Sequence, residues 1–146
     1  CRQSMNSAYA AVIPSWMNAM LTGAEVNING DGLTSRDFCH IDNVIQANII
    51  AALTTSEDSL NQIYNIALGD RTSLNELQQL ISKYLNIKAN VRYREFRDGD
   101  VRHSQADISK AIHLLGFMPS VRIEEGIKKT VIWYEDHFSS KSSRPQ

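Results

Sequence analysis

A capped amphipathic helix between two strand-like segments is the feature that most restricts how this chain can fold. Ser73 and Glu76 have the spacing of a capping box, in which each side chain accepts a hydrogen bond from the other residue's backbone amide. Residues 74–85 then follow an amphipathic helical pattern. The apolar run IYNIAL at 63–68 is typical of a buried strand, and NVRYREF at 90–96 of an edge strand. We therefore predict an α/β fold.

Four further helices are predicted from apolar residues that recur at helical spacing. In the first helix Pro14 fits the first turn, and Gly23 is expected to end the helix. Asp42 is expected to cap the second helix, and Gly116 to end the third. With the helix at 74–85, these make about five helices; the four are expected at residues 8–22, 43–55, 108–116 and 122–138.

Two further short strands are expected before the second helix. The segments EVNI at 25–28 and SRDFCHI at 35–41 flank NGDG at 29–32, which is the strongest turn signal in the chain. Residues 139–146 are predicted to be a disordered tail. Since we find no internal repeat and no sign of a second domain, residues 1–138 are interpreted as one lobe.

Composition and charge exclude two functional classes. Lys and Arg number 15 against 16 Asp and Glu, and the net charge of -1 argues against a nucleic-acid binder held by bulk charge. No apolar run approaches the roughly 20 residues of a membrane span, and no signal-peptide pattern is found. We interpret Cys1 and Cys39 as free thiols of a cytoplasmic protein. A chain that starts with Cys1 and not Met is either processed or a piece of a longer protein.

Motifs for catalysis and for cofactor or metal binding are lacking. The glycines do not have the spacing of a dinucleotide-binding loop after a strand. Tyr84 and Lys88 have a Tyr-x-x-x-Lys spacing, but they straddle the end of a predicted helix, which favours a solvated lysine. Cys39 and His40 are neighbours on a predicted strand and would point to opposite faces, which disfavours a shared metal ion. We therefore assign no catalytic residue and no metal ligand.

Two arginines occupy positions that suit phosphate binding. A tight turn delivers Arg36 at the start of a predicted strand, and Arg97 lies between a strand end and a Gly-containing turn. Guanidinium groups bind phosphate oxygens through paired hydrogen bonds, so two arginines at strand ends suit a diphosphate. Simple solvation of both arginines is the alternative.

Long ordered motifs resemble a known family. NGDGLTSRDFCHIDNVIQANIIAAL, and FRDGDVRHSQADISKAIHLLGFMP followed by EEGIKKTVIWY, resemble the C-terminal part of extended short-chain dehydrogenases/reductases, and more narrowly NAD-dependent UDP-sugar 4-epimerases. RQ with AYAAVIPSW, together with GDRTSLNEL, resembles the branch that acts on UDP-N-acetylglucosamine or its uronic acid in bacterial surface-polysaccharide synthesis. The resemblance runs from Arg2 to about His137.

The resemblance implies substrate-binding roles for Arg36 and for three residues of the segment 97–104. Arg36, in the family's GDG-x-x-x-RDF segment, and Arg97, in its R-x-GD segment, would contact the UDP diphosphate. Asp100 of the second segment would bind the uridine ribose, where a carboxylate suits hydroxyl donors. Ser104 would line the sugar pocket of the N-acetyl branch.

The N-terminal segments carry further implied contacts. Gln3 would lie near the sugar, and Ala11 and Val12 against the nucleotide. Asn27 matches a residue that flanks the uracil and is usually aromatic in this branch, so stacking would be lost. The sequence SMNS at 4–7 also departs from the Pro- and Gly-containing loop of the family.

The family's NAD-binding and catalytic residues have no counterparts among the motifs of this chain. In the family a Gly-rich turn holds NAD, and a Tyr-x-x-x-Lys pair with a Ser or Thr removes the 4-hydroxyl proton. No such residues are assigned here, so the chain is interpreted as the substrate lobe, with the N-terminal Rossmann core absent. The whole protein is then expected to bind NAD and UDP-sugar and to form a homodimer. The chain alone is expected to bind no cofactor and to be inactive, and we expect no nucleic-acid or membrane partner.

Two alternatives remain open. One is a truncated, non-catalytic module that binds nucleotide weakly or self-associates, because the helix and strand predicted at 43–55 and 63–68 would expose apolar surface without a Rossmann partner. The other is a lobe of a nucleotide-sugar 4,6-dehydratase or a uronate-type epimerase, which would share both arginines.

Overall fold

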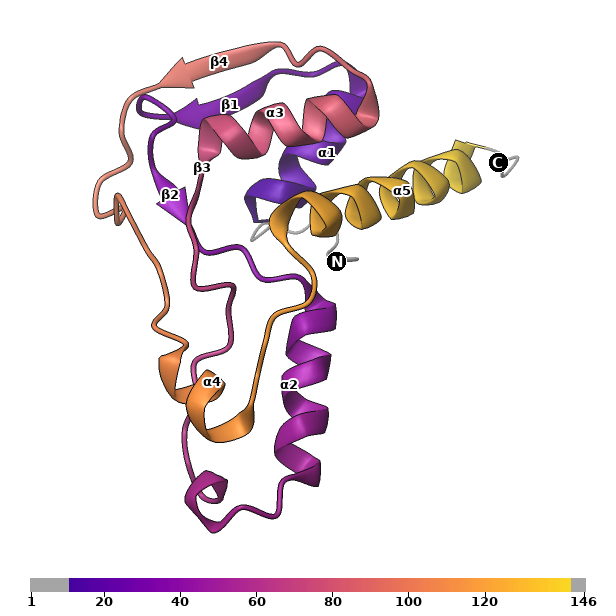
Figure 1. Cartoon of the computed structure of the whole chain (residues 1–146). Coiled ribbons are helices and arrows are strands. Elements are labelled where there is room, and N and C mark those ends of the chain that lie inside the picture. Colours follow the sequence, from indigo (N-terminus) through magenta and orange to yellow (C-terminus); the bar gives the residue numbers. More distant parts are fainter. Residues whose placement is uncertain (1–10, 143–146) are drawn as a thin grey trace. The chain divides into compact units, whose positions relative to one another are not determined.

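The chain has an α/β fold of short strands and helices, as predicted. The computed structural model describes residues 11–142 and, for side chains, residues 11–138. Five α-helices and four strands are described (Figure 1). In chain order the elements are α1 (Val12–Thr22), β1 (Val26–Asn29), β2 (Ser35–Arg36), α2 (Ile41–Leu53), the 3-10 helix η1 (Glu57–Ser59), β3 (Thr72–Ser73), α3 (Leu74–Leu85), β4 (Val91–Arg94), α4 (Ser109–Leu115) and α5 (Ile123–Ser142).

The chain divides into two compact units, a division that the sequence analysis does not predict. The first unit comprises Cys1–Thr34, Ser73–Asp100 and Ile127–Gln146. The second unit comprises Ser35–Thr72 and Val101–Gly126. The chain therefore passes repeatedly from one unit to the other.

The first unit is built on two parallel strands. β1 pairs with β4 in a register that runs from Val26 opposite Val91 to Asn29 opposite Arg94. Parallel neighbours cannot be joined by a tight hairpin, and the long connection from β1 to β4 includes α3, which directly precedes β4 (Figure 1). Val26 and Ile28 are buried on one face, as the period of two requires.

Helix faces predicted from the sequence form the core of this unit. On α1 Trp16 and Met20 are buried, and on α3 Leu77 and Ile81 are fully buried. Burial of each large apolar side chain contributes about 1.5–3 kcal/mol. Among the described residues of α5 in this unit, those buried are Ile127, Thr130, Val131 and Tyr134, and the three apolar ones belong to the apolar face predicted for that helix, which also includes Ile123.

Helix α3 has the predicted bounds and cap. The Ser73 hydroxyl accepts a hydrogen bond from the Glu76 amide (3.2 Å), and the Ser73 amide donates to Glu76 Oε2 (2.8 Å). The capping box is therefore complete, and the helix ends at Leu85, where Asn86 takes up a left-handed conformation.

Asn75 ties the predicted NGDG turn to the rest of the first unit. Its backbone amide donates to the Gly32 carbonyl (3.0 Å), and its Nδ2 donates to the Asp31 carbonyl (3.1 Å). The Tyr93 hydroxyl donates to Asn75 Oδ1 (3.0 Å). One side chain at the start of α3 thus holds both the turn after β1 and strand β4.

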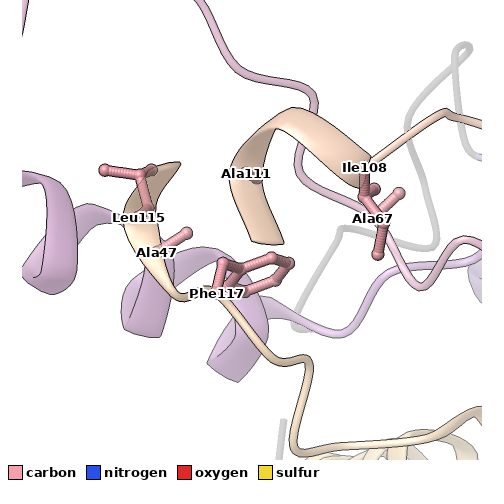
Figure 2. Close-up of a cluster of buried hydrophobic side chains, with 6 residues drawn as sticks. All are labelled: Ala47, Ala67, Ile108, Ala111, Leu115 and Phe117. Carbon is pink, nitrogen blue, oxygen red and sulfur yellow. The ribbon is translucent and has the colours of Figure 1, made fainter. Parts of the chain in front are cut away.

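The second unit is held together by a small apolar cluster (Figure 2). Phe117 is fully buried within it, next to α2 and α4. Asn43 of α2 is also fully buried, and it exchanges hydrogen bonds of 2.8 and 2.9 Å with the backbone of Val121. The cluster consists of Ala47, Ala67, Ile108, Ala111, Leu115 and Phe117.

Two strand predictions and one cap prediction are wrong. Only Ser35–Arg36 of the segment 35–41 is a strand, and residues 63–68, all within the described range, form none. For the second segment the reason is that the amides of Leu68 and Gly69, at its end, donate to the side chain of Asp37 and not to a neighbouring strand. Asp42 is not the cap of α2, because His40 occupies that position and its Nδ1 accepts from the Asp42 amide (3.2 Å).

The last helix continues further than predicted. α5 ends at Ser142, whereas the sequence pattern places its end at Phe138 and disorder from residue 139. Residues 143–146 of the predicted tail lie outside the described residues. Within the described range, no helix combines the length and apolar character needed to cross a membrane.

Candidate functional site

Arg36 lies on a short strand that is joined to a distant segment of the second unit. Ser35 forms a parallel bridge with His103, in which the Ser35 amide donates to the Arg102 carbonyl (2.9 Å) and the Ser104 amide donates to the Ser35 carbonyl (3.1 Å). The guanidinium of Arg36 donates from Nη1 to these same two carbonyls, at 2.9 Å to Ser35 and 3.4 Å to Arg102. Arg36 is half-buried. The carbonyls of Ser35 and Arg102 therefore help to set the direction of its guanidinium.

The same bridge places Ser104 beside Arg36. Residues that are 68 positions apart in the sequence thus meet on neighbouring segments, with Ser35 Oγ and His103 Nδ1 2.9 Å apart. Ser104 is exposed. Two of the residues that the resemblance assigns to substrate binding are therefore brought together, as a single-site interpretation requires.

Asp37 organises this region, and sequence reasoning did not identify it. Its Oδ1 accepts from the Leu68 amide (2.9 Å), and its Oδ2 accepts from the amides of Gly69 (3.0 Å) and Ala106 (3.3 Å). One carboxylate therefore joins three segments next to Arg36. No sequence signal reveals such a role, because the donors are backbone amides that almost every residue carries.

Arg97 and Asp100 lie in the first unit, at the two ends of a tight turn after β4. The Asp100 amide donates to the Arg97 carbonyl (3.1 Å), and Gly99 has the positive φ of 76° that suits the third position of a type II turn. Both residues are exposed. The turn thus places both residues at the surface; their contacts with a diphosphate and a ribose stay a prediction.

The remaining predicted residues of the first unit lie on β1 and at the start of α1. The Asn27 carbonyl accepts from Trp16 Nε1 (3.1 Å), while its Oδ1 is buried and has no hydrogen-bond partner among the described residues. Ala11 is the exposed N-cap of α1, and Val12 is half-buried at its first position. Gln3 lies outside the described residues.

The predicted binding residues are therefore divided between the units. Arg36 and Ser104 belong to the second unit, and Arg97, Asp100 and Asn27 belong to the first. That all of them line one pocket stays a prediction. The second unit also has a cavity of about 350 Å³, but none of the predicted binding residues that the structure describes lines it; its walls are Phe38, Leu68, Asp70, Thr72, Arg122, Ile123 and Glu124.

Two chemistries that the sequence disfavours, a metal site at Cys39 and His40 and a catalytic pair of Tyr84 and Lys88, involve residues that the structure describes. No cluster of three or more metal-ligating side chains occurs among the described residues. Burial raises the pKa of the Cys39 thiol, which works against the thiolate form that binds metals. Tyr84 lies inside α3 and Lys88 beyond the left-handed residue that ends it, so the two are not on one helix face.

Comparison with known proteins shows which class the chain resembles. The sequence profile described as the NAD dependent epimerase/dehydratase family matches residues 2–67. The chain is homologous to UDP-sugar 4-epimerases. It is 35% identical to the UDP-glucose 4-epimerase of Thermotoga maritima, whose structure was solved with UDP-glucose, with a TM-score of 0.84 over 94% of this chain and 43% of that chain.

Two further relatives are named as epimerases of other UDP-sugars. A UDP-N-acetylglucosamine 4-epimerase from Methanobrevibacter ruminantium M1, solved in complex with UDP-N-acetylmuramic acid, is 39% identical, with a TM-score of 0.83 over 93% of this chain and 43% of that chain. A UDP-glucuronate 4-epimerase from Thermodesulfobacterium geofontis is 34% identical over 113 residues, which are 77% of this chain and 34% of the relative. The chain thus spans less than half the length of these relatives.

Proposed function

We propose that this chain is the nucleotide-sugar-binding C-terminal part of an NAD-dependent UDP-sugar 4-epimerase. The observation that carries the proposal is the likeness, over 94% of the chain, to a UDP-glucose 4-epimerase solved with UDP-glucose. In this proposal the rest of the full-length protein supplies a Rossmann half that holds NAD and the proton-transferring residues. The substrate is UDP-N-acetylglucosamine or its uronic acid, and the enzyme is a cytoplasmic homodimer that serves surface-polysaccharide synthesis.

Arg36 and Arg97 bind the diphosphate in this proposal. A guanidinium is planar and always charged, and it pairs with phosphate oxygens through strong charge-assisted hydrogen bonds. Arg36 suits the role because its Nη1 is already held by the carbonyls of Ser35 and Arg102. Less side-chain freedom is then lost when a ligand binds, which favours affinity.

The other predicted residues act on the nucleoside and the sugar. Asp100 accepts hydrogen bonds from ribose hydroxyls, which a carboxylate can do through both oxygens. Ser104 and Gln3 face the sugar, and Ala11 and Val12 contact the nucleotide. Asn27 flanks the uracil without the stacking that an aromatic residue would provide.

Removing the Arg36 guanidinium is expected to weaken UDP binding by about 10- to 100-fold, because hydrogen bonds to charged groups contribute about 1.5–3 kcal/mol. Calorimetric titration of UDP into the full-length protein, wild type and Arg36→Ala, measures the effect. Arg36→Lys should give an intermediate affinity, since the charge is kept and the paired geometry is lost.

Arg71→Ala is the matched control for this experiment. Arg71 is an exposed arginine of the same unit with no assigned role, so its loss changes the net charge equally and should leave the affinity for UDP unchanged. Equal UDP affinities in the wild type and Arg36→Ala would remove Arg36 from the site.

A second candidate function rests on a different observation. The exposed residues of α2 include a line of apolar side chains at a spacing of four, with Ile45, Ile49 and Leu53 exposed by 49%, 54% and 75%. Such a face suits a non-catalytic module that binds nucleotide weakly or self-associates. Light scattering of the chain by itself over a range of concentrations tests this candidate, and a monomer throughout that range would contradict self-association.

A nucleotide-sugar 4,6-dehydratase is the remaining alternative within the same class. It would use the same two arginines, since the diphosphate is common to both substrates. Only the identity of the product distinguishes it from an epimerase.

A further inference from the structure

We propose that His103 is a positioning residue, which holds the Arg36 guanidinium in its binding direction by acting through Ser35. The proposal rests on the diphosphate-binding role given to Arg36 above. His103 is not among the residues that the resemblance assigns to the binding site.

The first step is the contact between His103 and Ser35. Ser35 Oγ and His103 Nδ1 are 2.9 Å apart, a good hydrogen-bond distance. Ser35 is only 7% exposed, and a buried hydroxyl requires a partner, which the imidazole provides. His103 itself is exposed, so its ring contributes little to the core of the second unit.

The second step joins Ser35 to the guanidinium. The Ser35 carbonyl accepts from Arg36 Nη1 and from the Ser104 amide. The Arg102 carbonyl accepts from Arg36 Nη1 and from the Ser35 amide. Both carbonyls that accept from Nη1 therefore also take part in the backbone bridge between Ser35 and His103. The side chains of Ser35 and His103 form a further hydrogen bond across this bridge. Loss of the imidazole would therefore loosen the two carbonyls that orient Arg36.

A purely structural role would have a different signature. If His103 only stabilised the second unit, its loss would lower the melting temperature and would affect every ligand alike. A residue that positions Arg36 affects the diphosphate alone, and it has no further effect once Arg36 has been removed. A double-mutant cycle tests this non-additivity directly.

The experiment uses the full-length protein as wild type, His103→Ala, Arg36→Ala and the double variant, titrated calorimetrically with UDP and with uridine. Melting curves establish that each variant is folded at the assay temperature. We expect His103→Ala to weaken UDP binding about tenfold and to leave uridine binding unchanged. In the Arg36→Ala background, the same substitution should change the affinity for UDP less than about twofold.

Two conservative variants sharpen the test. The amide of His103→Asn falls near the position of Nδ1 and can hydrogen-bond to Ser35, whereas the longer His103→Gln places its amide near the position of Nε2. His103→Asn should therefore keep near wild-type UDP affinity, and His103→Gln should behave like His103→Ala. This comparison remains decisive if the alanine variant fails to fold.

Each other outcome overturns a specific claim. If Arg36→Ala weakens UDP binding and neither His103→Ala nor His103→Gln does, the positioning role is wrong while the proposed function stands. If the losses from Arg36→Ala and His103→Ala add in the double variant, His103 does not act through Arg36. If Arg36→Ala has no effect, the role of Arg36 in diphosphate binding fails and the positioning role falls with it.

Discussion

Replacing Asp37 with alanine is expected to lower the free energy of unfolding by about 3–4 kcal/mol. The carboxylate accepts three backbone amides, those of Leu68, Gly69 and Ala106, at 2.9 to 3.3 Å. Each buried amide that loses its acceptor lowers the free energy of unfolding by about 1–3 kcal/mol. The loss is smaller for these partly buried amides, because water can replace part of the lost hydrogen bonding. Urea unfolding followed by circular dichroism at 25 °C measures the change.

Asp70→Ala is the matched control. Asp70 is exposed, and its Oδ1 accepts only from the amide of the next residue, Arg71, in the described hydrogen bonds (2.7 Å). It removes the same charge from the same unit, and its effect should stay within about 0.5 kcal/mol. Asp37→Asn should remain destabilising, because in either orientation the NH2 group replaces one of the two acceptor oxygens and cannot accept from a backbone amide. A midpoint for Asp37→Ala equal to that of Asp70→Ala would contradict the role of Asp37.

Replacing Gly32 with alanine is expected to cost about 2–4 kcal/mol, from two separate causes. Gly32 has a φ of 74°, a left-handed conformation that an L side chain adopts at a cost of about 1–2 kcal/mol. A Cβ at this position would clash with Asn75 Oδ1. Asn75 would then have to abandon its hydrogen bonds to the Asp31 carbonyl and to the Tyr93 hydroxyl. Denaturant unfolding again gives the difference.

Gly99→Ala separates the two causes. Gly99 has nearly the same φ, 76°, but a Cβ there meets no atom within 4 Å. Its cost should be the conformational part alone, and Gly32→Ala should cost clearly more. Combining Gly32→Ala with Asn75→Ala should show coupling, because the second substitution removes the clash. Equal costs for Gly32→Ala and Gly99→Ala would show that the contact with Asn75 contributes nothing.

The elements that were predicted correctly are those that local chemistry specifies. The capping box of Ser73 and Glu76 and the helical spacing after it are contained within 13 residues, and α3 has the predicted bounds. The turn at 29–32 follows equally from its own glycines. These features need no knowledge of the rest of the chain.

The strand predictions failed where contacts with residues distant in sequence determine the structure. The segments 35–41 and 63–68 have strand-like composition, but Asp37 in the first segment accepts hydrogen bonds from the amides of Leu68 and Gly69 at the end of the second. The pairing of β1 with β4 brings together residues that are distant in sequence, such as Val26 and Val91. The periodicity of either segment does not reveal its partner. The division into two units is likewise a property of long-range contacts.

The candidate site was predicted by resemblance and only partly by residue chemistry. Two arginines at strand ends suggested a diphosphate, while the roles of Asp100, Ser104 and Asn27 came from the resemblance alone. The structure adds the neighbouring positions of Arg36 and Ser104 and the contact of His103 with Ser35. Asp37 and His103 were missed because their partners lie more than 30 residues away in sequence.

The most direct test of the proposed function is the product that the full-length protein forms from UDP-N-acetylglucosamine with NAD present. NMR and mass spectrometry of the reaction should show the C4 epimer, with the mass of the nucleotide sugar unchanged and no net consumption of NAD. The uronic acid of the same sugar serves as the second substrate. A product lighter by one water would identify a dehydratase, and the absence of any C4 epimer from either substrate would contradict the proposed epimerase.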